Sequence, residues 1–445
     1  MRPRLSICVP SRNRQTWFAQ TINALLENPR GDLEFVFADN SDDATIMADV
    51  IKAHRDDPRV VFLPPGPTVY SMVDNWERTV AASSGDWVTV IGDDDYVDPD
   101  LASVLTKVEL LLPDVEAFGW GYASFNWPDC VGAPDTNVAL ELTHHFVEMP
   151  KEWLLRRAFL WVDATTAPTH GFSIYHSALS RRLIERIRER FKGRYFEHPT
   201  VDFDSSFKSV LLGNRFVMWQ RPLSIHGVCP LSISSIAFDA KNIRTANVTV
   251  MAEIGRNYFN DPTMEGLPFR VEMGVPASVL ATQQWVKHSA GFAIDGWQEN
   301  FARCCAYYCS RFPSREDFAY MTDIYRTAFA QWENGRYAHA FNPVHLDLPV
   351  NYGAFSGIKD GKIYLNNRNT GAQTPRDMYD VMSAMLPPLE DVVIDQTLLR
   401  RPADAAPATP LALHAQSSEE PSIASSSAFR NASAIPAETP RSARP

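Results

Sequence analysis

The first hundred residues of this chain alternate between short apolar runs and stretches in which apolar residues recur at helical spacing. Apolar runs bounded by turn residues are typical of buried strands, and spacings of three and four residues, as at Phe18, Ile22 and Leu25, are typical of helices. Strands separated by helices favour an α/β fold, in which helices cover both faces of a mostly parallel sheet. The expected strands are 5–9, 33–38, 60–63 and 87–91, and the expected helices are 16–26, 43–53 and 71–82.

The patterns beyond residue 115 are less regular. A basic segment of helical spacing occupies 179–191, and a strand-like run follows at 215–219. Helical spacing at 277–286, 298–310, 315–332 and 376–385 predicts a mainly helical region over 241–400. Residues 401–445 are dominated by alanine, serine and proline and hold too little apolar surface to offset the entropy lost on ordering, which predicts a disordered tail.

The charge balance and cysteine pattern exclude several classes of protein. The chain of 445 residues has a net charge of −11, and nucleic-acid binding is not expected because neutralising phosphates requires clustered basic residues. No apolar run reaches the roughly 20 residues of a membrane span, and the N-terminus lacks the apolar core of a signal peptide. The 6 cysteines form no CxxC pair. These features predict a cytoplasmic protein, and peripheral attachment to a membrane stays open.

Polar residues follow three of the expected strands at the point where each strand ends. They are Pro10, Ser11, Asn13 and Arg14 after the first strand, Asp39 and Asn40 after the second, and Asp93, Asp94 and Asp95 after the fourth. Ligands of open parallel sheets bind beyond the carboxyl ends of the strands. The sequence therefore predicts a crevice with two acidic walls and a basic loop.

The triplet of aspartates at 93–95 carries most of this prediction. Adjacent carboxylates repel one another, and a hard divalent cation, which prefers carboxylate oxygens, would offset that repulsion. The alternatives are a solvated acidic turn and the cap of a helix beginning near Pro99. Asp39 could accept hydrogen bonds from a nucleobase or a ribose, or it could cap the helix that follows it.

Residues 5–99 resemble the nucleotide-binding half of family 2 glycosyltransferases, which have the GT-A fold. The segments SICVPSRNR, EFVFADNSDD, AASSGDWV and VIGDDDYVDP occur in the family's order and at its spacing. The resemblance implies a Rossmann-like GT-A sheet, with a nucleotide-sugar-binding half at 1–115 and an acceptor half at 116–240. It also implies sugar transfer from a nucleotide-diphosphate donor to an acceptor hydroxyl, dependent on Mn²⁺ or Mg²⁺ and inverting.

The resemblance also implies roles by position. The donor would contact Pro10, Ser11, Asn13, Arg14, Asp39, Asn40, Asn75 and Asp93, and a metal ion would be held by Asp94, with Asp95 as a further candidate. The chain departs from the family at Ala38, where a second acid is common, and at Arg12, where a tyrosine is common. The segment 70–76, which contains Asn75, replaces a usual Arg-Asn segment. These departures leave the base and the sugar of the donor open.

Inverting transfer needs a base that deprotonates the acceptor hydroxyl. The resemblance places it in the acidic segment at 197–204, where Asp202 is favoured and Asp204 is the alternative; both could instead complement the dipole of a helix. A late histidine, His226, is the remaining candidate metal ligand, and a structural role is its alternative. The pairs at 169–170 and 175–176 could line the acceptor pocket or the core.

The large aromatic residues after residue 115 could be core residues or sugar-binding platforms. Phe118, Trp120 and Trp127 are expected in the core rather than as sugar-binding platforms.

The expected partners are a nucleotide sugar and a saccharide, a lipid-linked glycan or another hydroxyl acceptor, and the oligomeric state stays open. Nucleotidyl transfer and a non-catalytic nucleotide- or sugar-binding module are the rival functions.

Overall fold

The computed structural model describes residues 2–130, 137–141, 145–169, 171–232, 238–255, 257–346, 355–359, 361–395, 399–400 and 414–415. The predicted disordered tail at 401–445 lies outside the described residues, apart from the strand β15 (His414–Ala415), which pairs antiparallel with β11 (Phe292–Ala293). His170, a candidate for the acceptor pocket, also lies outside them.

The N-terminal quarter folds as the alternation of strands and helices predicts. The strands are β1 (Leu5–Ser11), β2 (Leu33–Asp39), β3 (Val60–Leu63) and β4 (Trp87–Val90), and the helices are α1 (Gln15–Leu26), α2 (Ala44–Lys52), α3 (Met72–Ala82) and α4 (Leu101–Leu111). The four strands lie side by side in the order β3-β2-β1-β4, and each pair is parallel. The side chains of Asp43 and Ser71 accept backbone hydrogen bonds at the starts of α2 and α3, which explains why these helices begin there.

This parallel core belongs to a ten-stranded sheet in the order β14-β8-β10-β6-β9-β4-β1-β2-β3, to which β5 is joined through β10. The added strands are β5 (Tyr96–Val97), β6 (Ala117–Asn126), β8 (Phe146–Met149), β9 (Ser177–Ser180), β10 (Phe216–Val228) and β14 (Leu399–Arg400). β6 is parallel to β10 and antiparallel to β9. The mixed sheet confirms the expected α/β class with a largely parallel centre.

Two elements after residue 115 differ from their expected bounds. The strand expected at 215–219 is β10, and it continues to Val228 through register shifts on either side of Pro222. Proline has no N–H to donate to the ladder, so the strand bends there instead of ending. The basic helix expected at 179–191 begins later, because Ser180 closes β9 and its side chain accepts the N–H of Leu183 at the start of α6 (Arg181–Arg190).

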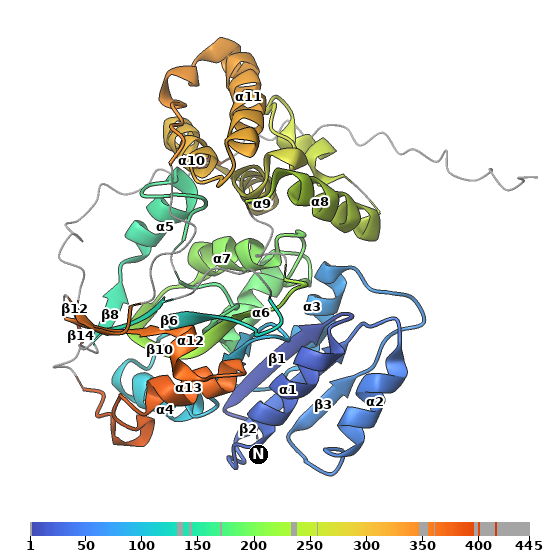
Figure 1. Ribbon diagram of the computed structural model, residues 1–445, viewed down its shortest axis with the longest axis vertical. Helices are drawn as coiled ribbons and strands as arrows, with labels where there is room; N and C mark the ends of the chain where they lie inside the picture. The colour runs from blue at the N-terminus through green and yellow to red at the C-terminus, as the bar shows by residue number, and fades with distance from the viewer. Residues whose placement is uncertain are drawn as a thin grey trace, which may run out of the picture.

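The region expected to be mainly helical, 241–400, has two parts in the structure. A layer of α8 (Ala240–Ile254), α9 (Val275–Ala290), α10 (Gln298–Ser310) and α11 (Arg315–Gln331) lies beyond α7 (Val201–Leu212), on the side away from the sheet (Figure 1). The chain then returns to the sheet. The returning elements are β12 (Gly357–Lys359), β13 (Lys362–Asn366), α12 (Asn367–Thr370) and α13 (Pro375–Ser383), and β13 pairs with β7 (Asn137–Glu141).

Short elements complete the described chain. They are the helix α5 (Lys151–Leu160) and the 3₁₀ turns η2 (Tyr258–Asn260), η3 (Pro262–Met264), η4 (Val271–Met273), η5 (Trp332–Gly335), η6 (Ala338–Ala340) and η7 (Leu389–Asp391). Within the described residues, no helix combines the length and apolar character that crossing a membrane requires.

The sheet separates two large apolar cores. One core joins α5, α6 and α7 to the helical layer and contains the buried Cys304, Cys305 and Cys309. The other lies against α1 and α4 and contains Phe118, Trp120 and Trp127, of which none is more than 4% exposed. The aromatic residues that could have been sugar-binding platforms are therefore core residues, as expected.

Candidate functional site

The strand register brings the predicted crevice residues to one edge of the sheet. Ser11, the last residue of β1, lies opposite Asp39, the last residue of β2. Pro10 lies one position earlier, opposite Ala38. β4 runs parallel to β1 in register from Trp87 to Val90, so the turn that follows β4 reaches the same edge. The carboxyl ends of three neighbouring strands thus meet, as the sequence predicts.

The aspartates of the triplet are buried, with exposed fractions of 3% for Asp93, 4% for Asp94 and 1% for Asp95. This excludes the solvated acidic turn. It also excludes the helix cap, because α4 begins after Asp100 and not at the triplet. Buried carboxylates require hydrogen bonds or opposite charges, and each of the three has its own set of partners.

Asp93 faces the basic loop. The Ser11 hydroxyl donates to Asp93 Oδ2 at 2.6 Å, and Arg14 Nη1 donates to Asp93 Oδ1 at 2.9 Å. Burial raises the pKa of Asp93, and the neighbouring Arg14 charge opposes that increase. Arg14 Nη2 also donates to the Leu231 carbonyl at 2.8 Å, so one guanidinium connects the triplet to the loop after β10.

Asp94 has one engaged and one open carboxylate oxygen. Its Oδ2 accepts from Ser232 Oγ at 2.5 Å and from the Cys229 N–H at 3.2 Å. Within the described residues no donor makes a hydrogen bond to Oδ1, whose charged neighbour is Arg14 Nη1 at 3.5 Å. The Asp94 carbonyl touches β10 so closely that a Cβ on Gly227 would lie 1.7 Å from it, so only glycine fits there.

Asp95 is held at both oxygens. Its Oδ2 accepts from Tyr175 at 2.8 Å, from His176 Nε2 at 3.0 Å and from the Gly92 N–H at 2.7 Å, and its Oδ1 accepts from the Gly227 N–H at 2.7 Å. Burial favours a higher pKa for Asp95, but His176, His226 and the Tyr175 hydrogen bond outweigh burial and hold the pKa below its usual range. Asp95 therefore ties the triplet to β10.

The donor set of the triplet fits a hard cation that the substrate helps to hold. Within the described residues no group of three or more histidine, cysteine or acidic side chains could hold a metal ion by itself. The open oxygen of Asp94 is a suitable single ligand, since Mg²⁺ usually takes one or two protein carboxylates together with substrate phosphates and water. The metal roles of Asp95 and His226 stay predictions.

Asp39 is fully buried at the neighbouring strand end. Its Oδ1 accepts the Ser41 N–H at 2.9 Å, whereas its buried Oδ2 has no hydrogen-bond partner among the described residues. The cap of α2 is Asp43, so the alternative role of Asp39 as a helix cap is excluded. An unpaired buried carboxylate oxygen is costly, and a ligand N–H or O–H would satisfy it.

Polar side chains around Asp39 connect the end of β2 to the segment before α3 and to α3 itself. The Asn40 amide donates to the Tyr70 carbonyl at 2.9 Å and accepts the Tyr70 N–H at 3.0 Å. Arg78 donates to the Asp39 carbonyl at 2.6 Å and to Asn75 Oδ1 at 2.8 Å, and it stacks over the Tyr70 ring at 4.5 Å. Asn40 and Asn75 thus hold the surroundings of Asp39, Asn40 through the backbone of Tyr70 and Asn75 through Arg78.

Asn13 shapes the basic loop. It adopts a left-handed backbone conformation with φ of 54°, which asparagine tolerates better than most residues. Its amide donates to Asp42 Oδ2 and its Oδ1 accepts the Asp42 N–H, both at 2.9 Å. This pairing joins the loop after β1 to the loop after β2.

The two candidate bases at the start of α7 have different surroundings. Asp204 is fully buried, and Lys208 Nζ lies 3.0 Å from both of its oxygens. Asp202 accepts the N–H of Phe203 at 2.9 Å, and burial raises its pKa to about 6. Its charge acts on Tyr122 and Tyr175, and Tyr175 is a hydrogen-bond partner of Asp95. Asp202 therefore borders the acidic triplet, whereas Asp204 forms a buried ion pair.

A cluster of aromatic side chains lies beside Asp95. The His226 ring lies 5.8 Å from His176 and 6.1 Å from Tyr122, and burial lowers the pKa of His226. His176 also contacts Ser224 Oγ through Nδ1 at 2.8 Å. Sequence reasoning missed Tyr122, Ser232 and Arg78, because each reaches the site through contacts between residues far apart in the sequence. The left-handed backbone of His176, with φ of 56°, has no local sequence signal either.

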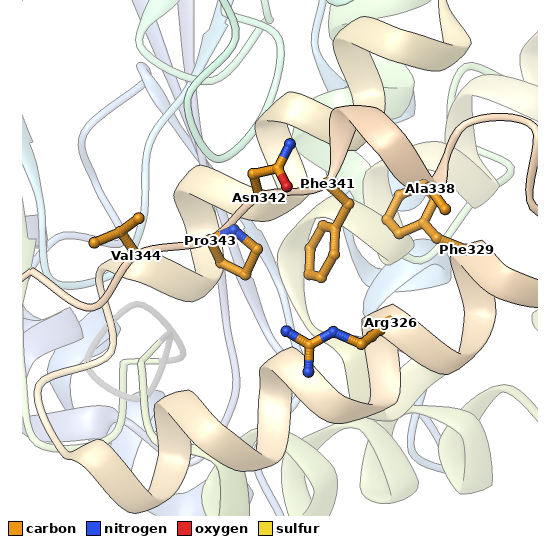
Figure 2. A pocket seen from close by; sticks show the side chains of 7 residues that line it. All are labelled: Arg326, Phe329, Ala338, Phe341, Asn342, Pro343 and Val344. Atoms are coloured by element: carbon orange, nitrogen blue, oxygen red, sulfur yellow. The ribbon is translucent and has the colours of Figure 1, made fainter.

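A separate hollow of about 510 Å³ lies in the helical layer, between α11 and the segment after η6 (Figure 2). Phe329, Phe341 and Val344 line it, and the Arg326 side chain reaches toward Phe341 and Pro343. None of the predicted site residues lines this hollow.

Comparisons with known proteins match one family model to the part of the chain that contains this sheet edge. The model described as glycosyl transferase family 2 matches residues 6–184, and no curated protein sequence matches the chain. Residues 1–349 of TarS from S. aureus are 14% identical, with 76% of this chain and 90% of that chain covered and a TM-score of 0.38. The same TarS fragment in complex with UDP-GlcNAc is 13% identical at 76% and 90% coverage, with a TM-score of 0.40. A mycobacterial protein is 17% identical over 57% of this chain and 76% of that chain, with a TM-score of 0.33.

Proposed function

We propose that the chain, whose residues 6–184 match the glycosyl transferase family 2 model, moves a sugar from a nucleotide-diphosphate donor to an acceptor hydroxyl. The observation that carries this proposal is the buried triplet at the carboxyl edge of the sheet, with the open oxygen of Asp94 and with an Asp202 whose charge acts on Tyr175, a hydrogen-bond partner of Asp95. The reaction is proposed to invert the anomeric centre and to depend on Mn²⁺ or Mg²⁺.

The donor nucleotide is proposed to lie across the ends of β1 and β2. The unpaired Oδ2 of Asp39 accepts an N–H of the base, and Asp93 accepts a ribose hydroxyl. Arg14 has a side chain that is 20% exposed at the crevice, and it provides positive charge for the diphosphate. Asp94 would hold a divalent metal ion through Oδ1, and such an ion would supply positive charge next to the departing diphosphate.

Asp202 is proposed to act as the general base. It takes the proton of the acceptor hydroxyl while that oxygen bonds to the anomeric carbon and the bond from that carbon to the diphosphate breaks. The products are a glycoside with inverted configuration, a nucleoside diphosphate and a protonated Asp202. A pKa of about 6 suits this role, because the group is ionised at neutral pH and still has appreciable affinity for a proton.

Nucleotide binding tests the crevice directly. Thermal unfolding is measured with UDP, GDP, CDP, dTDP and ADP, each with and without Mn²⁺, because a ligand that binds only the folded state raises the melting temperature. A metal-dependent increase with one nucleotide is expected, together with its loss in Asp94→Asn. Asp49→Asn is the matched control, since this side chain is 74% exposed on α2. An increase that survives in Asp94→Asn contradicts the metal assignment.

Product analysis then separates the rival functions. Sugar transfer releases a nucleoside diphosphate from the nucleotide sugar, whereas nucleotidyl transfer to a sugar phosphate releases pyrophosphate. The non-catalytic module predicts binding without turnover across a broad panel of acceptors. Release of the nucleoside diphosphate that depends on Asp202 supports the proposal, and pyrophosphate release overturns it.

A further inference from the structure

Tyr122 is an exposed aromatic residue on a central strand, where exposure is unusual. It lies on β6, between β10 and β9, and it is 58% exposed, whereas Trp120 and Ala123 on the same strand are 3% and 5% exposed. β9 pairs with β6 only from Ala117 to Gly119, so the strand is uncovered on that side at Tyr122. A large ring left open at this position is a candidate ligand contact.

The surroundings of the ring place it at the reaction centre. The His176 ring is stacked against Tyr122 at 5.3 Å with an interplanar angle of 30°, and His226 lies at 6.1 Å and 55°. Partial burial and the negative charges of Asp202 and Asp95 raise the pKa of Tyr122. The ring is therefore supported from behind by His176 and lies within the electrostatic reach of Asp202.

We propose that the open face of Tyr122 is the stacking platform for the sugar ring of the acceptor, which makes the acceptor a glycoside. An aromatic face supported by a second ring suits the flat C–H face of a pyranose, since both surfaces are apolar and rigid. Asp202, whose charge acts on Tyr122, is the base that would take the proton of a hydroxyl of such a sugar. The platform belongs to the acceptor and not to the donor nucleotide, whose proposed contacts lie on β1, β2 and the triplet.

This inference rests on the proposed function and has its own test. Saturation-transfer NMR is recorded on the full chain with the methyl glycosides of glucose, galactose, N-acetylglucosamine and rhamnose. The variants are Tyr122→Phe, which keeps the ring, and Tyr122→Ala, which removes it. Tyr320→Ala is the matched control, because Tyr320 is 41% exposed on α11, far along the chain from the site.

The expected result is saturation of the ring C–H protons of at least one glycoside in the wild type, Tyr122→Phe and Tyr320→Ala. Affinity in Tyr122→Ala should fall roughly tenfold, the upper end of what one aromatic contact contributes. No glycoside signal in the wild type, or an equal signal in Tyr122→Ala, overturns the proposal. Nucleotide binding is measured on the same samples. Nucleotide binding without glycoside binding refutes the platform alone. Absence of nucleotide binding in the wild type refutes the proposed function.

Discussion

The pKa of Asp202 gives a prediction that distinguishes this residue from an ordinary surface aspartate. Burial raises the pKa to about 6, against 3.8 for an unperturbed aspartate. If Asp202 is the base, kcat at saturating donor and acceptor depends on its ionised fraction. At pH 5 this fraction is about one-tenth for a pKa near 6 and about nine-tenths for an unperturbed aspartate. We therefore expect kcat to fall about fivefold between pH 6 and pH 5 and to approach a tenfold fall for each further pH unit.

The assay is direct chromatography of the released nucleoside diphosphate between pH 4.5 and 8.5, with circular dichroism to confirm folding at each pH. Saturating donor is essential, because burial also raises the pKa of Asp93 and donor affinity has its own pH dependence. Asp202→Asn should lower kcat by about 10²–10⁴-fold and leave nucleotide binding unchanged. Asp49→Asn should behave like the wild type. A kcat that stays level down to pH 4.5 would refute the assignment of the base.

The same shift predicts a change in stability that needs no substrate. A carboxylate whose pKa is higher in the folded state stabilises the fold below its unfolded pKa of 3.8, and this contribution is lost as the pH rises through about 6. Ionised Asp202 therefore destabilises the fold at pH 8. Because Asp202 is partly exposed, we expect Asp202→Asn to gain about 1–3 kcal/mol in the free energy of unfolding at pH 8 and little at pH 4. Urea unfolding at both pH values measures the difference, and an equal change at both contradicts the burial argument.

Three further substitutions test the supports of the site. Lys208→Met leaves Asp204 buried without its counter-ion and should cost about 3–5 kcal/mol in urea unfolding, part of which Lys208→Met/Asp204→Asn should recover. An undiminished stability would contradict the buried pair. His176→Phe removes a hydrogen bond to Asp95 and should weaken metal-dependent nucleotide binding in titrations. His176→Gln should weaken this binding less, because the glutamine side chain can still donate a hydrogen bond. Equal effects of the two substitutions would refute a hydrogen-bonding role. Gly227→Ala forces a Cβ to within 1.7 Å of the Asp94 carbonyl and should lower the free energy of unfolding by at least about 1–3 kcal/mol. It should also abolish nucleotide binding. An unchanged melting temperature would contradict this expectation and show that the turn can move aside.

Much of the N-terminal quarter could be predicted from the sequence, because its information is local. The strand at 60–63 has its predicted bounds, and β1, β2 and β4 differ from prediction by one or two residues. In the helical layer, the helix at 298–310 also has its predicted bounds. Apolar periodicity reports on each element by itself, and the rule that ligands bind at the carboxyl edge then brings Ser11, Asp39 and the triplet together. The register of β1 with β2 confirms that placement.

The strands and bends after residue 115 were harder to predict, because long-range pairing overrides local signals there. The predicted strand ends at residue 219, yet β10 continues to Val228 because β6 pairs with it along its length. The helical pattern of 241–400 did not indicate that β13 pairs with β7 or that α13 packs back on the sheet, where Tyr379 donates to Asp98 at 2.6 Å.

The sequence by itself determined which chemical groups this protein has and at which strand ends they lie, since a parallel sheet assigns those positions from spacing alone. Only the tertiary structure decided how the groups differ from one another. Asp202 and Asp204 are two residues apart, but Lys208 forms its ion pairs with Asp204 and Glu197 and not with Asp202. Asp94 and Asp95 are adjacent, but Tyr175, His176 and Gly227 engage both oxygens of Asp95, whereas one oxygen of Asp94 is left open. Burial and hydrogen bonding set the role of a carboxylate, and both depend on residues that are distant in the chain and close in space.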